Sequence, residues 1–179
     1  AGYFEPEHTM FGIDFPATAE LVGRFAEAVD VLDLLLGNDV SSYQGRYYRL
    51  QEARFRPRPR QQPRPPLVVG AKGRRMLGIC ARKADVWNAG VSSAEEVREL
   101  GAVLDECCAA AGRDPASIRR SNYYMVSRLG TDPWQSLEAF TDVAGRYQEA
   151  GIDEFIVDPP ASGQERVLEL VADSFLVHA

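Results

Sequence analysis

The chain has 179 residues, 45% of them hydrophobic and 26% charged, which suffices for one domain of ordinary size. A formal net charge of -6 argues against binding to nucleic acid or to an anionic membrane, so we expect neither as a partner. Cys80, Cys107 and Cys108 lack the spacing of a zinc site or a disulfide framework, and no signal peptide or membrane-spanning run is present, so we expect a cytoplasmic protein without a bound metal.

The first part of the chain opens with Ala1 in a loop-like stretch, from which we expect a fragment or a processed protein. Apolar residues at helical spacing then predict a buried helix face ending at Gly37. Two short segments rich in β-forming residues, 40–43 and 46–50, flank Gln44-Gly45 and predict a hairpin. The residues of the helix face are Phe25, Ala28, Val29, Leu32, Leu35 and Leu36.

A proline-rich run, RPRPRQQPRPP, occupies residues 56–66 and fits neither a helix nor a central strand. It could be a PxxP ligand or a basic arm, but isolated arginines in an acidic chain favour a solvated connector that leads into a buried strand. We therefore expect a single domain over residues 1–179, with a hairpin insertion and a proline-rich connector at about 38–66.

After residue 66 the pattern alternates regularly between strands and helices. Ser93 and Glu96 form a capping box before the second of these helices, which stops at Gly112, and Asp132-Pro133 is the predicted start of the third, which ends at Gly151. The predicted last helix carries the apolar residues Val167, Leu168, Val171 and Phe175. The predicted strands are 67–70, 84–90, 118–129 and 152–158, and the first helix is 74–82.

Strands separated by helices of this length imply parallel pairing, so the predicted class is α/β with a parallel sheet. Residues 67–70, 85–88, 123–127 and 155–158 should be neighbours in that sheet, with the helices on its outer face. An open doubly wound sheet and a barrel both fit. A complete (β/α) barrel needs about 250 residues, so four units in this chain would be roughly its second half.

Four blocks of sequence together resemble one known family. The opening GYFEPEHTMFGIDFP, the hairpin SSYQGRYYRL, the run PRPRQQPRPPLVVGAKG and the stretch ARKADVWNAG resemble, in order and spacing, landmarks of the bacterial luciferase-like superfamily. The resemblance implies an incomplete (β/α)8 TIM barrel with roughly strands 4 to 8. It also implies FMN or the deazaflavin F420 as cofactor, and hydride transfer or monooxygenation of a small-molecule substrate. Because a half barrel exposes unpaired strand edges, we also expect a homo-oligomer.

The strongest candidate site is the turn Val69-Gly70-Ala71-Lys72-Gly73, which follows a strand and opens a helix. Glycines there let the backbone approach an anion, and free N–H groups at the helix start favour phosphate. Lys72 and Arg74 add cations, although both also fit ordinary solvated positions. Many strand-to-helix junctions look alike, and the resemblance adds that the cofactor phosphate of the family lies on the matching loop. Many relatives have a second glycine or a small hydroxyl residue where Ala71 and Lys72 stand.

The resemblance also places the backbone of Val86, Trp87 and Asn88 near that phosphate, and Gly2 and Tyr3 beside the cofactor ring system. The Trp87 side chain itself is better explained as a core aromatic.

The opening segment offers Glu5, Glu7 and His8 for proton transfer. Simple exposure is the commoner outcome for such a cluster, so no residue is assigned a catalytic role.

Three functions remain open at this point. The leading hypothesis is a flavin- or F420-dependent oxidoreductase or monooxygenase that lacks its N-terminal strands. The alternatives are a noncatalytic barrel-like binding or structural subunit, and a phosphosugar-binding α/β enzyme. The last alternative shares the glycine turn but explains neither the hairpin nor the proline run.

Overall fold

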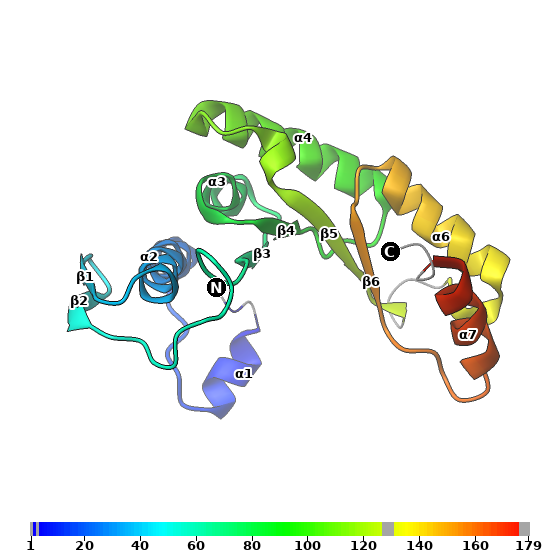
Figure 1. The fold of residues 1–179 in the computed structure, drawn as a ribbon, viewed down its shortest axis with the longest axis horizontal. Coiled ribbons are helices and arrows are strands. Elements are labelled where there is room, and N and C mark those ends of the chain that lie inside the picture. The colour runs from blue at the N-terminus through cyan, green and yellow to red at the C-terminus, as the bar shows by residue number, and fades with distance from the viewer. Residues whose placement is uncertain (1, 3, 127–130, 176–179) are drawn as a thin grey trace. The chain divides into compact units, whose positions relative to one another are not determined.

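The computed structural model describes residues 2, 4–126 and 131–175. The chain divides into two compact units, residues 1–67 and residues 68–179, which are described separately below (Figure 1). The expectation of a single domain over the whole chain stays a prediction.

The first unit contains two helices, α1 (Glu5–Met10) and α2 (Thr18–Gly37). The long helix ends at Gly37, as its apolar spacing predicts. The short helix α1 replaces the loop expected for the opening segment. A proline in its first turn and the early carboxylates Glu5 and Glu7 favour a helix start, because they suit its unpaired N–H groups and positive dipole.

A hairpin follows α2, and its strands β1 (Ser41–Gln44) and β2 (Arg49–Ala53) pair antiparallel in a sheet of their own. This confirms the predicted hairpin, although the second strand begins at Arg49 instead of residue 46. The carboxylate of Glu27 accepts hydrogen bonds from the backbone N–H groups of residues 46–48 at distances of 2.8 to 3.1 Å. These residues form the turn because their N–H groups point at Glu27 and away from a partner strand.

The proline-rich connector is attached to α2 by two of its arginines. The Arg58 guanidinium donates to the carbonyl oxygens of Leu35, Leu36 and Asn38 at 2.7 to 2.8 Å, at the end of the helix where carbonyls lack helical partners. Arg64 donates to the Asp33 carboxylate at 2.6 Å. These two arginines are partly buried, while most of the other connector residues are exposed, as expected of a solvated connector.

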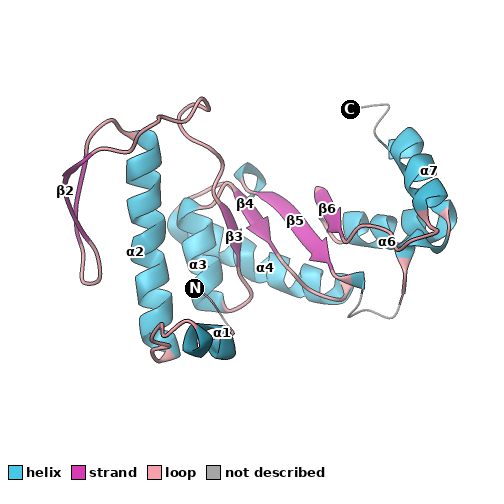
Figure 2. Cartoon of the chain, turned by 90° about the horizontal axis from the view of Figure 1, so that it is seen from below, coloured by secondary structure: helices cyan, strands magenta, loops and turns pink. Residues whose placement is uncertain are grey.

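The second unit is built on a four-stranded sheet in the order β3-β4-β5-β6, in which every neighbouring pair is parallel (Figure 2). This confirms the predicted parallel sheet. Its strands are β3 (Val68–Gly70), β4 (Val86–Asn88), β5 (Arg119–Tyr124) and β6 (Glu154–Val157). Its helices are α3 (Arg74–Lys83), α4 (Ala94–Ala111), α6 (Leu137–Glu149) and α7 (Glu165–Phe175), with 3-10 turns at Pro115–Ser117 and Pro133–Gln135.

The two faces of this sheet differ in burial. Val69 and Trp87 are register partners on one face, and both are buried. Figure 1 shows α3, α4 and α6 on one side of the sheet, as a helical layer requires. On the other face Val68, Tyr123 and Ile156 are 60%, 38% and 41% exposed. Val86 and Ser121 also lie on that face and are buried, so the face is open at Val68, Tyr123 and Ile156 and covered at Val86 and Ser121.

Two predicted boundaries in the second unit need correction. Asp132 caps only a 3-10 turn, and α6 begins four residues further on, because Ser136 is extended and its hydroxyl caps the N–H of Ala139 at 3.1 Å. Strand β5 ends at Tyr124, short of the predicted end at 129, and residues 127–129 lie outside the described part. The capping by Ser93 is confirmed, since its hydroxyl accepts from the N–H of Glu96.

Candidate functional site

The predicted glycine turn lies between β3 and α3, at the carboxyl end of the strand. Gly73 is the residue before α3, and among the described residues no side chain caps the N–H groups of this helix. A Cβ atom added at Gly70 or at Gly73 would meet nothing within 4 Å. The turn therefore leaves open space next to uncapped N–H groups, which is the arrangement that an anion needs.

The backbone of this turn is held from the neighbouring strand and helix. The indole N–H of Trp87 donates to the carbonyl oxygen of Ala71 at 2.8 Å, and the N–H of Ala71 donates to the carbonyl of Asn88 at 3.3 Å. The Cys80 thiol of α3 lies 3.6 Å from the carbonyl of Val69, and burial raises the pKa of this thiol to about 12. Cys80 is thus a structural thiol, because a thiolate is the reactive form.

The two cations of the turn differ in their surroundings. The Arg74 guanidinium pairs with Glu106 of α4 at 2.7 Å, and this hydrogen bond raises the pKa of Arg74. Both partners are more than half exposed, so the pair contributes little stability. Lys72 is exposed and forms no hydrogen bond or ion pair with the described residues. Lys72 is therefore the cation that is most readily available to an anion.

The neighbouring strand β4 ends at the same edge of the sheet as the turn. Val86 and Trp87 are buried at 2% and 0% exposure, which confirms the interpretation of Trp87 as a core aromatic. Asn88 is the register partner of both Gly70 and Ser121, and its amide donates to the Ser121 hydroxyl at 2.9 Å. The carboxyl ends of β3 and β4 therefore meet beside the turn.

The loop after β4 is fixed by a residue that sequence reasoning missed. The Asn122 side chain is fully buried, accepts from the N–H of Val91 at 3.0 Å and donates to its carbonyl at 3.2 Å. An asparagine in a strand of mixed polarity carries no signal in the sequence, because its partner lies 31 residues away. Asn122 holds the loop that follows β4 through hydrogen bonds to both of its backbone groups at Val91.

The opening residues lie in the first unit. Glu5 and Glu7 are exposed on α1, as the simpler interpretation expects. The His8 ring packs edge-on against Phe15, with centroids 5.0 Å apart, and covers Gly2 so closely that a Cβ there would lie 2.6 Å from its Cε1. Tyr3 lies outside the described residues, so the placement of Gly2 and Tyr3 beside a cofactor stays a prediction.

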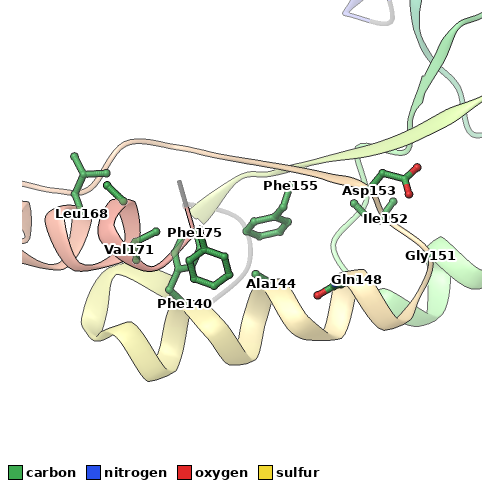
Figure 3. A pocket seen from close by; sticks show the side chains of 11 residues that line it. Phe140, Ala144, Gln148, Gly151, Ile152, Asp153, Phe155, Leu168, Val171 and Phe175 are labelled. Atoms are coloured by element: carbon green, nitrogen blue, oxygen red, sulfur yellow. The ribbon is translucent and has the colours of Figure 1, made fainter. Parts of the chain in front are cut away.

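A large cavity lies away from the glycine turn. It lies next to β6, which is the strand at the opposite edge of the sheet from β3. It encloses about 720 Å³ between β6, α6 and α7 (Figure 3). Phe140, Phe155 and Phe175 line it, and Asp153 is the ionisable residue among its lining. Such a lining offers an apolar surface but no set of groups for acid-base chemistry.

Among the described residues, no helix is both long and apolar enough to cross a membrane. Over the same residues, no group of three or more His, Cys, Asp or Glu side chains is arranged to hold a metal ion.

The fold and the turn define a class: a parallel α/β protein with an open glycine turn at the carboxyl end of a strand. The family follows from a direct match. Residues 1–127 match the family described as luciferase-like monooxygenases, so the chain belongs to this family of flavin- and F420-dependent oxidoreductases and monooxygenases. This confirms the resemblance inferred from the four sequence blocks.

Relatives and solved structures agree with this assignment. The F420-dependent glucose-6-phosphate dehydrogenase of Kineococcus radiotolerans is 30% identical over 132 residues, which are 73% of this chain and 38% of the relative. The F420-dependent tetrahydromethanopterin reductase of Methanopyrus kandleri has a TM-score of 0.75 at 15% identity, over 98% of this chain and 72% of that chain. A long-chain alkane monooxygenase has a TM-score of 0.73 at 14% identity, over 96% and 59%.

These likenesses identify the fold as part of a luciferase-like (β/α)8 barrel, as predicted. An F420-dependent secondary alcohol dehydrogenase, solved with an F420-acetone adduct, has a TM-score of 0.72 at 16% identity, and this chain spans 63% of its length. The matched segment spans well under half of the curated relative.

Proposed function

We propose that this chain is the C-terminal part of a flavin- or F420-dependent oxidoreductase or monooxygenase, and that residues 69–74 bind the phosphate of its cofactor. The observation that carries the proposal is the turn itself. Its two glycines leave open space, and no side chain in the described part of the protein caps the N–H groups at the start of α3. Relatives that are named as F420-dependent, and a similar fold in a monooxygenase, support the choice of cofactor class.

The residues of the turn fit a phosphate-bearing cofactor. Gly70 and Gly73 provide room for the phosphate oxygens, and the N–H groups of residues 72 and 73 provide donors. Lys72 adds a charge-assisted contact, while Arg74 would have to share its guanidinium with Glu106. The backbone of Val86 and Trp87 borders the turn through the pairing of β3 and β4. FMN or F420, when bound, supplies the redox chemistry, in which a hydride or an activated oxygen is transferred to a small-molecule substrate.

We also propose which partners and which compartment suit the chain. A net charge of -6 and a pI of about 5.0 disfavour nucleic acid as a partner. The free thiols Cys80, Cys107 and Cys108 suit a reducing cytoplasm. The exposed apolar side chains Val68, Tyr123 and Ile156 on one face of the sheet favour a homo-oligomer.

The proposal is tested by Gly70→Val and Lys72→Ala, with affinity for FMN and for F420 measured by fluorescence quenching. Valine at position 70 fills the space for the anion, so we expect affinity to fall by more than about 30-fold, which is about 2 kcal/mol. Lys72→Ala removes one contact that water partly replaces and should cost about 1 to 2 kcal/mol.

The matched control is Gly37→Val at the end of α2, where an added Cβ also meets nothing within 4 Å. Circular dichroism checks that each variant keeps its fold. If Gly70→Val folds and binds both cofactors as tightly as the parent chain, the phosphate lies elsewhere and the proposed site is wrong.

A further inference from the structure

Trp87 has a contact that its role as a core aromatic does not require. Its side chain is fully buried, and its indole N–H is 2.8 Å from the carbonyl oxygen of Ala71 in the glycine turn. Trp87 is the register partner of Val69, which places both side chains on the same face of the sheet. Both are buried, so the indole reaches the turn from the interior, and the Ala71 carbonyl points inward.

The direction of that carbonyl determines the direction of the next N–H group. The peptide bond between Ala71 and Lys72 is trans, since the cis bonds of the described residues are at Arg56-Pro57 and Gln62-Pro63. In a planar trans peptide the C=O and N–H bonds point in opposite directions. Because the oxygen of Ala71 points to the buried indole, the N–H of Lys72 points away from the interior. Among the described residues no acceptor is recorded for the N–H groups of Lys72 and Gly73.

We infer that Trp87 is a positioning residue for the phosphate site: its indole N–H fixes the Ala71-Lys72 peptide so that the Lys72 N–H faces the ligand. The inference rests on the proposed function of the turn. Without the indole donor the carbonyl of Ala71, a residue that is 5% exposed, loses its partner. Rotation of the peptide then relieves this loss by turning the oxygen outward, where it would face an anion and repel it.

The neighbouring residues limit what else could orient this peptide. The N–H of Ala71 is already bonded to Asn88, so it fixes the preceding peptide and leaves the one between Ala71 and Lys72 free to rotate. Among the described residues, the N–H of Lys72 forms no hydrogen bond that would hold its backbone. Gly73 adds flexibility on the far side of the peptide. Trp87 is therefore the group that holds the orientation of the Lys72 N–H.

The test compares Trp87→Phe with Trp134→Phe. Phenylalanine keeps an aromatic ring in the buried space and removes the indole N–H in both variants. Trp134 is a matched control, because it is 4% exposed and its indole donates to the Asp158 carbonyl at 2.8 Å. It belongs to the cluster with Phe140 and Val171, away from the turn. Both substitutions remove one buried indole hydrogen bond, so a general loss of stability should affect both alike.

The readout is the preference for a phosphate-bearing ligand over its phosphate-free counterpart. Dissociation constants are measured for FMN and riboflavin, and for F420 and its phosphate-free deazaflavin core. We expect the parent chain and Trp134→Phe to prefer the phosphate-bearing member of at least one pair. Trp87→Phe should lose about tenfold or more of this preference, while its affinity for the phosphate-free member stays unchanged. A residue with a purely structural role would lower both affinities together.

The outcomes separate the inference from the function on which it rests. If the parent chain has no phosphate preference in either pair, the proposed site is wrong and the inference falls with it. If the parent has the preference and Trp87→Phe keeps it within about twofold, the inference is wrong and the site stands. If Trp87→Phe does not fold, 3-benzothienylalanine at position 87 replaces the N–H by sulfur in a ring of nearly the same shape, and the same criterion applies.

Discussion

Glu27 is the side chain that fixes the turn of the hairpin. Burial of its carboxylate raises the pKa, but hydrogen bonds from the N–H groups of residues 46–48 and the charge of Arg46 outweigh this, so the pKa lies below its ordinary value. Gly45 suits this arrangement, because a Cβ there would collide with the Glu27 carboxylate and displace it. One charged residue of α2 thus sets where the second strand begins.

We predict that Glu27→Gln destabilises the chain at neutral pH and that the difference disappears in acid. A folded-state pKa below the unfolded value of about 4.3 means that the carboxylate stabilises the fold above this pH. The contribution is lost as the pH falls through the folded-state pKa. The free energy of unfolding is measured by guanidinium denaturation of both proteins between pH 7 and pH 3. Glu20→Gln, in an exposed pair with Arg24, is the control and should change little.

Single residues also show what the sequence can and cannot predict about the site. The glycines of the turn were found because they combine a strand end, a helix start and small residues within a few positions. The bond between Trp87 and Ala71 spans 16 residues, and the bonds of Arg58 to the end of α2 span 20 to 23. Such partners depend on how the elements pack, which the local sequence does not contain.

Two helices of the second unit, α4 and α6, begin at serine caps, and the sequence predicted one of the two correctly. Ser93 has Glu96 three residues later and an apolar run after it, which is the usual signature of a cap. Ser136 was missed because Asp132-Pro133 offers the same type of signal four residues earlier, and the chain uses that signal for a 3-10 turn. Competition between two nearby start signals is decided by packing, here by burial of Trp134 in the turn.

We predict that Ser93→Ala and Ser136→Ala each lower the free energy of unfolding by about 1 kcal/mol, within a range of about 0.5 to 2. Each hydroxyl accepts from a backbone N–H at 3.1 Å, and alanine leaves that donor without its cap. Ser174→Ala is the control, because this hydroxyl lies within α7 and donates to the Leu170 carbonyl, where alanine favours the helix. Urea denaturation monitored by circular dichroism measures all three. Equal stability of Ser93→Ala and the parent would show that the cap contributes nothing.

At the scale of the whole molecule, the order and direction of the strands were predictable and the open face of the sheet was not. Alternation of strands and helices implies parallel crossovers, and this alternation predicts the sheet topology. Burial depends on which parts of a barrel are present. Val68 and Ile156 look like core residues in the sequence, yet they are 60% and 41% exposed.

We predict that the chain associates with itself through this open face and through β3 and β6, which pair on one side only among the described residues. Exposed apolar surface and unpaired strand edges both favour contact with another chain. Sedimentation velocity should give a mass above the 19.8 kDa of one chain, rising with concentration.

Ile156→Lys places a charge on the open face of the sheet and should restore the mass of a single chain. Val40→Lys is the control, since Val40 is equally exposed at 41% but precedes the hairpin in the first unit. A parent chain that sediments as a monomer at every concentration would contradict this prediction. Association that survives Ile156→Lys would mean that a different surface is used.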